Sequence, residues 1–222
     1  MTTRNFETNM LDVNFINIID YLGTFAFAIS GIRLASAKRF DWFGAYIVGL
    51  VTAIGGGTTR DLLLSITPFW MQQPSYLIVT GFALLFVIIF GRYVIRLKNT
   101  FFIFDTIGLG LFVVVGIERT LDAGFPFWVA IVMGTITGSV GGIMRDIFIN
   151  VEPLVFRKDI YALACVFGGL MFFSCSLAGV PEPVTQVIAA SSVILIRILA
   201  VKYHISLPAL KGADDRKNLR KK

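Results

Sequence analysis

The chain alternates between long apolar runs and short polar connections, and no connection is long enough for a separate soluble domain. Most of the runs have the roughly 17–25 residues that a helix needs to cross a bilayer. Proline follows the second and fifth runs, at Pro68 and Pro153, where it ends a helix because it has no backbone N–H. The pattern predicts an all-α integral membrane protein with seven transmembrane helices, over Phe15–Leu34, Trp42–Ile66, Tyr76–Ile95, Phe101–Ile117, Phe127–Asn150, Ile160–Leu177 and Val184–Tyr203.

Composition supports the same class. Of the 222 residues, 56% are hydrophobic and 15% are charged, and the mean hydropathy is +0.78. A soluble domain averages about 25% charged residues. No nucleophile–base pair, nucleotide-binding loop, metal-ligand spacing or nucleic-acid-binding module can be placed, so we expect neither an enzyme nor a cofactor, and no nucleic-acid partner.

The distribution of Lys and Arg predicts how the chain is oriented. Fifteen of the 20 basic residues fall in the alternate connections and in the C-terminal tail, whereas Arg4 and Arg119 alone fall on the opposite side. Because basic loops stay in the cytoplasm, the N-terminus is expected outside and the C-terminus inside. The basic tail over residues 205–222 acts either as this topology signal or as a contact for anionic lipid.

An internal repeat organises the chain. At a constant offset of 85 residues, Asp20, Gly23, Phe27, Gly31, Gly49, Thr52, Gly56, Gly57, Arg60, Asp61, Pro68 and Tyr76 all match residues of their own type. Each copy contains three predicted spans, so the second copy enters the membrane from the opposite side, as in many transporters and channels. The expected organisation is a tail over 1–14, repeats over 15–100 and 101–183, a seventh helix over 184–204 and the basic tail.

Each repeat places two acids and an arginine inside its predicted spans. A charge in the hydrocarbon region costs a few kcal/mol or more unless it is paired or hydrated. The charges therefore either pin helices together or line a polar pathway. We expect Asp105 to approach Arg145, and Asp20 to approach Arg60 or its neighbouring helix. The intramembrane candidates are Asp20, Arg60, Asp61, Asp105, Arg145 and Asp146.

Glycine clusters mark the second and fifth spans, at Gly55–Gly57 and Gly141–Gly142. Small residues allow close helix packing, but three consecutive glycines also favour a kink that frees backbone carbonyls. Freed carbonyls at membrane depth must face protein or water, and they are good ligands for a dehydrated alkali cation. We therefore predict kinks in both helices, and a pathway lined by Thr52, Gly55, Gly56, Gly57, Thr58, Thr137, Gly141 and Gly142.

These motifs carry a family resemblance. The segments 31–38, 55–64, 68–70 and 141–146 resemble the bacterial branch of the trimeric intracellular cation (TRIC) channels, over nearly the whole chain. The resemblance implies seven spans, a homotrimer in the bacterial plasma membrane, and a potassium-conducting pore in each subunit, where the ion binds only transiently. Animal members carry a Lys-Glu-Val motif linked to phosphoinositide lipid; Thr-Thr-Arg-Asp follows Gly57 here, so that lipid site is not expected.

Two functions remain open because some bacterial relatives resemble glycine transporters. In a monovalent cation channel, the aspartates attract the ion while Arg60 and Arg145 hold them in place or gate. In a secondary transporter of a small amino acid, the helix N-terminus near Thr58, with Arg60, binds the carboxylate. Selective, unsaturated current is expected of the first, and saturable glycine counterflow without unitary current of the second.

Overall fold

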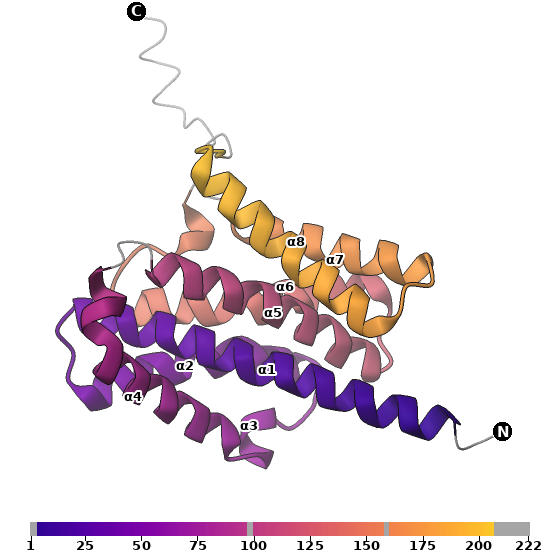
Figure 1. The fold of residues 1–222 in the computed structure, drawn as a ribbon, viewed down its shortest axis with the longest axis horizontal. Coiled ribbons are helices and arrows are strands. Elements are labelled where there is room, and N and C mark those ends of the chain that lie inside the picture. The colour runs from indigo at the N-terminus through magenta and orange to yellow at the C-terminus, as the bar shows by residue number, and fades with distance from the viewer. Residues whose placement is uncertain (1–3, 97–99, 158–159, 207–222) are drawn as a thin grey trace, which may run out of the picture.

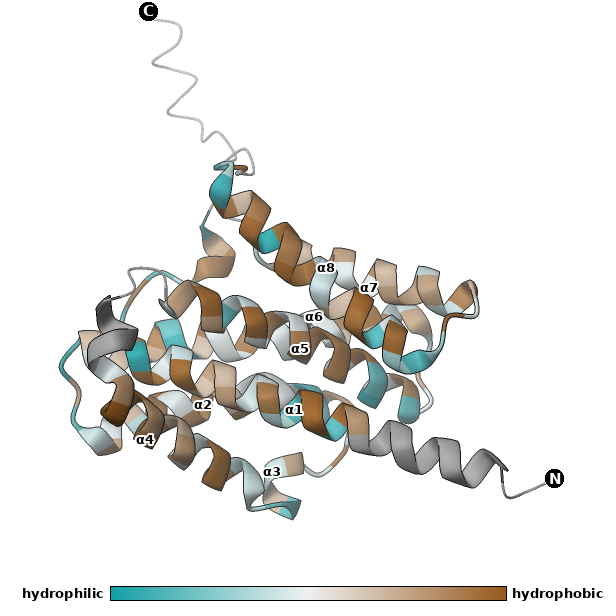
Figure 2. Cartoon of the chain, viewed as in Figure 1, coloured by the Kyte–Doolittle hydropathy of each residue, from teal (hydrophilic) through white to brown (hydrophobic). Residues whose placement is uncertain are grey.

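The computed structural model describes residues 4–96, 100–157 and 160–206, and this part of the chain is helical almost throughout (Figure 1). The helices are α1 (Arg4–Ala37), α2 (Trp42–Leu63), α3 (Phe69–Gln72), α4 (Ser75–Arg96), α5 (Thr100–Asp122), α6 (Phe127–Phe148), the 3-10 turn η1 (Leu154–Phe156), α7 (Ala162–Leu177) and α8 (Glu182–Lys202). Hydrophobic residues follow the lengths of the helices, and many of the hydrophilic ones lie toward the helix ends and connections (Figure 2).

Helices α1 and α5 lie side by side in the middle of the molecule (Figure 1). α1 also packs against α2 and α4, and α5 packs against α6, α7 and α8. α2 crosses α6, which joins the two halves a second time. Helix α8 thus stands outside the pair of three-helix units and covers one side of the second unit.

Contacts between the halves are reciprocal, which is the pattern that an inverted repeat predicts. Gly23 packs on the ring of Phe112, and its repeat equivalent Gly108 packs on the ring of Phe27. The two phenylalanine rings meet edge to face, with centroids 5.0 Å apart. A local two-fold axis between α1 and α5 accounts for all these contacts.

The glycine clusters lie where α2 crosses α6. A Cβ on Gly56 would overlap the carbonyl oxygen of Thr137, and a Cβ on Gly141 would overlap that of Thr52. Both helices continue without interruption through these residues. The predicted kinks are therefore not confirmed: the glycines let two backbones touch, and a helix needs no break for that.

Four described helical segments are long and apolar enough to cross a membrane, namely Phe15–Ala37, Thr100–Asp122, Phe127–Phe148 and Glu182–Lys202. The apolar parts of α4 and α7 are shorter. The predicted count of seven spans therefore stays a prediction. Helix α1 begins at Arg4, within the predicted tail, but its apolar span begins at Phe15, where the first span was predicted. Helix α5 runs on to Asp122, past the expected end at Ile117.

Candidate functional site: two charged vestibules

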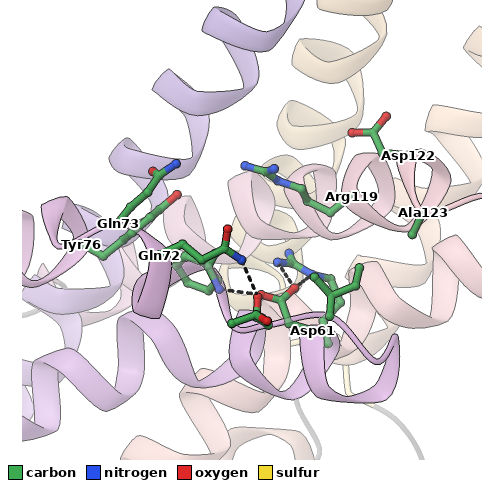
Figure 3. Close-up of a pocket in the computed structure, with 11 residues that line it drawn as sticks. Asp61, Gln72, Gln73, Tyr76, Arg119, Asp122 and Ala123 are labelled. Atoms are coloured by element: carbon green, nitrogen blue, oxygen red, sulfur yellow. Dashed lines mark hydrogen bonds and ion pairs between the residues drawn. The ribbon is translucent and has the colours of Figure 1, made fainter.

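A cavity of about 260 Å³ opens between the C-terminal ends of α2 and α5 and the N-terminal end of α4. Figure 3 shows Arg119 and Asp122 of α5 on one wall, with Gln72, Gln73 and Tyr76 on the other and Asp61 between them. We call this cavity the Asp61 vestibule. It is lined by Arg60, Asp61, Ile66, Thr67, Phe69, Gln72, Gln73, Tyr76, Arg119, Asp122 and Ala123.

Asp61 uses its two carboxylate oxygens for different partners. Oδ1 accepts hydrogen bonds from Nε and Nη2 of Arg60, at 2.9 and 2.6 Å. Oδ2 accepts the backbone N–H of Phe69 at 2.9 Å. That N–H opens α3 directly after Pro68, and helix N-termini leave such donors without intrahelical partners. Asp61 therefore joins its own helix to the short helix that follows.

Asp20 lies beside this vestibule and accepts a hydrogen bond from the hydroxyl of Tyr76 at 2.7 Å. Its side chain is buried, and the Tyr76 ring packs on Phe69. Within the described residues no hydrogen bond or ion pair joins Asp20 to Arg60, and the hydrogen-bond partner of Asp20 is Tyr76 of α4. A match in membrane depth fixes one coordinate and leaves the direction of the side chain around the helix open.

The second charged cluster is built on the same motif at the opposite end of the molecule. Asp146 accepts from Nε of Arg145 at 2.8 Å and from the backbone N–H of Leu154 at 3.1 Å. Arg145 also donates to the hydroxyl of Ser30 at 2.8 Å and forms an ion pair with Asp105. The predicted approach of Asp105 to Arg145 is confirmed.

A second guanidinium, which the sequence interpretation did not include in the site, joins this cluster. Arg197 of α8 lies with Nη2 3.6 Å from Oδ2 of Asp105. It donates to the carbonyl of Ile160 at 3.1 Å and stacks on the ring of Tyr161 at 4.7 Å. Arg197 lies outside the repeat, so it has no matching charge 85 positions away that would have indicated its role. Its position inside an apolar span was the signal that could have found it.

A cavity of about 310 Å³ adjoins Asp146, and we call it the Asp146 vestibule. Its walls are mostly apolar, and Lys38 and Arg157 contribute its cationic groups. Seven of its lining residues lie 85 positions from lining residues of the Asp61 vestibule: Leu34, Ala37, Lys38, Asp146, Val151, Leu154 and Arg157. The repeat therefore builds one vestibule at each end of the molecule.

The remaining predicted pathway residues lie at the helix crossing between the vestibules. Thr52 and Thr137 are buried and each donates to the carbonyl four residues earlier in its own helix, at 2.6 and 2.7 Å. Gly57 faces the ring of Phe69, and Gly142 faces the hydroxyl of Tyr161. Thr58 accepts the indole N–H of Trp70 at 3.0 Å. Among the described residues, no group of three or more His, Cys, Asp or Glu is arranged to hold a metal ion.

A sequence model of the family described as glycine transporter matches residues 17–92 and 102–176. A UPF0126 membrane protein of Vibrio cholerae is 38% identical over 89% of this chain and 84% of its own length. The UPF0126 inner membrane protein YadS of Escherichia coli is 37% identical over 86% of this chain and 93% of its own length.

The fold is also that of a solved channel. The crystal structure of the TRIC trimeric intracellular cation channel orthologue from Rhodobacter sphaeroides superposes with a TM-score of 0.81 and 31% identity. The match covers 86% of this chain and 98% of that one. Together with the apolar spans, these similarities identify a membrane protein and confirm the resemblance drawn from the glycine and Arg-Asp motifs.

Proposed function

The chain belongs to the bacterial TRIC channel family, whose members the family model describes as glycine transporters, and from this membership we propose that it conducts monovalent cations, potassium among them. The observation that carries the proposal is the pair of vestibules at opposite ends of one subunit. Each reaches an Arg-Asp pair four residues beyond the glycine crossing of α2 and α6. A pathway between the repeats would pass from one vestibule to the other.

Charge around the Asp61 vestibule favours a cation. The lining balances Asp61 and Asp122 against Arg60 and Arg119, and the buried Asp20 beside it adds one further carboxyl group. A local excess of one sign of charge concentrates the opposite ion. At the Asp146 end the charges are more fully paired, because Arg145 is shared by Asp105 and Asp146, so we propose that a cation enters the pathway from the Asp61 end.

The proposal includes a location and an assembly. We place the chain in the bacterial inner membrane, as the printed name of the Escherichia coli relative has it for that protein, and in a homotrimer, as the Rhodobacter structure is described. The Asp146 end, with Lys38 and Arg157, faces the cytoplasm under the positive-inside rule. Anionic lipid at the basic tail remains a prediction, because residues 207–222 lie outside the described part of the chain.

The test is potassium flux into liposomes that contain the purified protein. Asp122 is exposed at the wall of the Asp61 vestibule and has no ion pair among the described contacts, so changing it leaves the folded clusters intact. Asp122→Lys should reduce flux about tenfold at low salt, because electrostatic focusing contributes on that scale. The flux of Asp122→Asn should lie between those of the unchanged protein and Asp122→Lys, and high salt should remove the differences in flux. Equal flux in all three proteins at low salt would reject a cation pathway through this vestibule.

Glycine transport is the second candidate, because the same vestibule presents both signs of charge. Arg60 and Arg119 can bind a carboxylate, and Asp122 can bind an ammonium group, in a cavity small enough for a compact amino acid. A substitution at Arg119 is expected to change the two transport activities in opposite directions. Removing its charge in Arg119→Met should raise potassium flux through a channel, whereas it should reduce saturable glycine counterflow through a transporter.

A further inference from the structure

A third cavity, of about 390 Å³, lies outside both vestibules, between the ends of α5, α6, α7 and α8. We call it the Glu118 cavity. Its lining combines two glutamates with two aromatic rings, two hydroxyl groups and aliphatic side chains: Glu118, Leu121, Phe127, Phe172, Ser176, Val180, Glu182 and Thr185. The last turn of α5 separates it from the Asp61 vestibule, because Glu118 and Leu121 face one cavity while Arg119 and Asp122 face the other.

Glu118 is a buried carboxylate without a positively charged partner. It is 7% exposed, and within the described residues it forms no ion pair. Its Oε1 accepts one hydrogen bond, from Nε2 of Gln186 at 2.8 Å. The same Nε2 lies 3.5 Å from Oε1 of Glu182, so one neutral amide serves two carboxylates. A buried carboxyl group is normally paired with a cation or neutralised, and no described side chain supplies a cation here.

Burial of Gln186 sharpens this imbalance. Gln186 is 1% exposed, and its own Oε1 has no hydrogen-bond partner in the described part of the chain. The carboxyl groups of Glu118 and Glu182, and the amide oxygen of Gln186 beside the cavity, all accept hydrogen bonds, and the described side-chain bonds to the two carboxyl groups come from the Gln186 amide. An N–H-bearing cation would supply what the site lacks, namely positive charge and donors.

The aromatic and aliphatic walls define the class of cation. The rings of Phe127 and Phe172 lie with centroids 6.4 Å apart beside the carboxylates. Aromatic faces attract ammonium groups, and small-molecule sites are typically apolar cavities of about 300–1,000 Å³ with a few placed polar groups. We propose that the Glu118 cavity binds an organic ammonium ion, its nitrogen at Glu118 and Glu182 and its hydrocarbon part against the two rings.

Two other ligand classes fit less well. An amino acid would bring its carboxylate into a cavity whose lining residues include neither Lys nor Arg. A small divalent metal ion requires several oxygen ligands at close range, whereas the walls here are largely hydrocarbon.

The test measures binding of phenethylammonium chloride to the purified full-length protein by titration calorimetry and by the shift in melting temperature. Matched probes are 3-phenylpropanol, which is neutral, 3-phenylpropionate, which is anionic, and calcium chloride. The amine should bind and raise the melting temperature, while the three other probes should not. Glu118→Gln keeps the shape and should weaken amine binding about tenfold, because a charge-assisted hydrogen bond is roughly twice as strong as a neutral one.

Two further variants keep the proposal falsifiable if Glu118→Gln does not fold. Glu182 is exposed at the opening, so Glu182→Gln should fold and should weaken the amine several-fold. Phe172→Leu should weaken phenethylammonium without creating affinity for the anionic probe. Unchanged amine affinity in Glu118→Gln and Glu182→Gln, equal binding of the neutral probe, or a response to calcium but not to the amine would each overturn the proposal.

Discussion

The two Arg-Asp clusters have the same sequence motif and differ in what surrounds it. Arg60 lines an open vestibule, and its hydrogen bonds in the described structure all go to Asp61. Arg145 is fully buried and is shared by Asp146, Asp105 and Ser30. The difference comes from side chains that the repeat does not duplicate: Ser30 corresponds to Val115, and Arg197 belongs to α8. A symmetric backbone therefore carries two clusters that differ in how many partners share the arginine.

The largest expected effect comes from removing the shared cation. Arg145→Met should lower the free energy of unfolding by about 3–5 kcal/mol, because it leaves Asp105 and Asp146 buried together without Arg145. Arg60→Met should cost less, about 1.5–3 kcal/mol, because it removes hydrogen bonds to one carboxylate beside a cavity. Thermal unfolding of the two variants in the same detergent makes the comparison. Equal losses would mean that the clusters are energetically equivalent despite their surroundings.

The glycine crossing should respond equally from both sides. Gly56→Ala and Gly141→Ala each place a methyl group against a backbone carbonyl, and overpacking of this kind costs about 3 kcal/mol. Gly81→Ala in α4 is the matched control, since a Cβ there meets nothing within 4 Å. It should be neutral or slightly stabilising by helix propensity. Stable Gly56→Ala and Gly141→Ala proteins that lose transport would instead favour the kinked pathway predicted from the sequence.

The smallest expected effect concerns the two tyrosines at equivalent positions. Tyr76→Phe should destabilise by about 1.5 kcal/mol, because it removes the hydrogen bond to the Asp20 carboxylate. Tyr161→Phe should be neutral or stabilising, since the buried Tyr161 hydroxyl has no hydrogen-bond partner among the described residues and its ring, on which Arg197 stacks, is retained. Melting temperatures of both variants check this. A loss in Tyr161→Phe equal to that in Tyr76→Phe would point to a partner for that hydroxyl.

The repeat could be recognised in the sequence because the contacts of the matched residues require the same residue types in both halves. Asp61 and Asp146 each hold an arginine and the first N–H of the next helical turn, so the spacing from aspartate to Phe69 or Leu154 is the same in both halves. The short α3 and η1 that these bonds begin were not predicted, since three or four residues carry no helical periodicity. The family resemblance followed from the same motifs, whereas the all-α class followed from the long apolar runs.

Partner choice inside the membrane was less accessible to sequence reasoning. Comparing the depths of residues along their helices correctly predicted the approach of Asp105 to Arg145. It did not distinguish Arg60 from Tyr76 as the hydrogen-bond partner of Asp20. The role of the glycines was equally ambiguous, because a kink and a close crossing both require a small residue. The crossing depends on which carbonyl lies opposite, at Thr137 and Thr52, and only the three-dimensional arrangement supplies that.

Gly56 contacts Thr137 and Gly141 contacts Thr52, so α2 and α6 touch at a point about which the two halves could rotate relative to each other. If each repeat tilts as a rigid body about this point, the distance between the repeats increases at the Asp146 end and decreases at the Asp61 end by a similar amount. Conduction with both ends open at the same time would instead require α2 and α6 to bend beyond the crossing. Distances measured across both ends of the same molecules, with spin labels for example, would distinguish rigid tilting from helix bending. The two distances change in opposite directions if the repeats tilt rigidly, and independently if the helices bend.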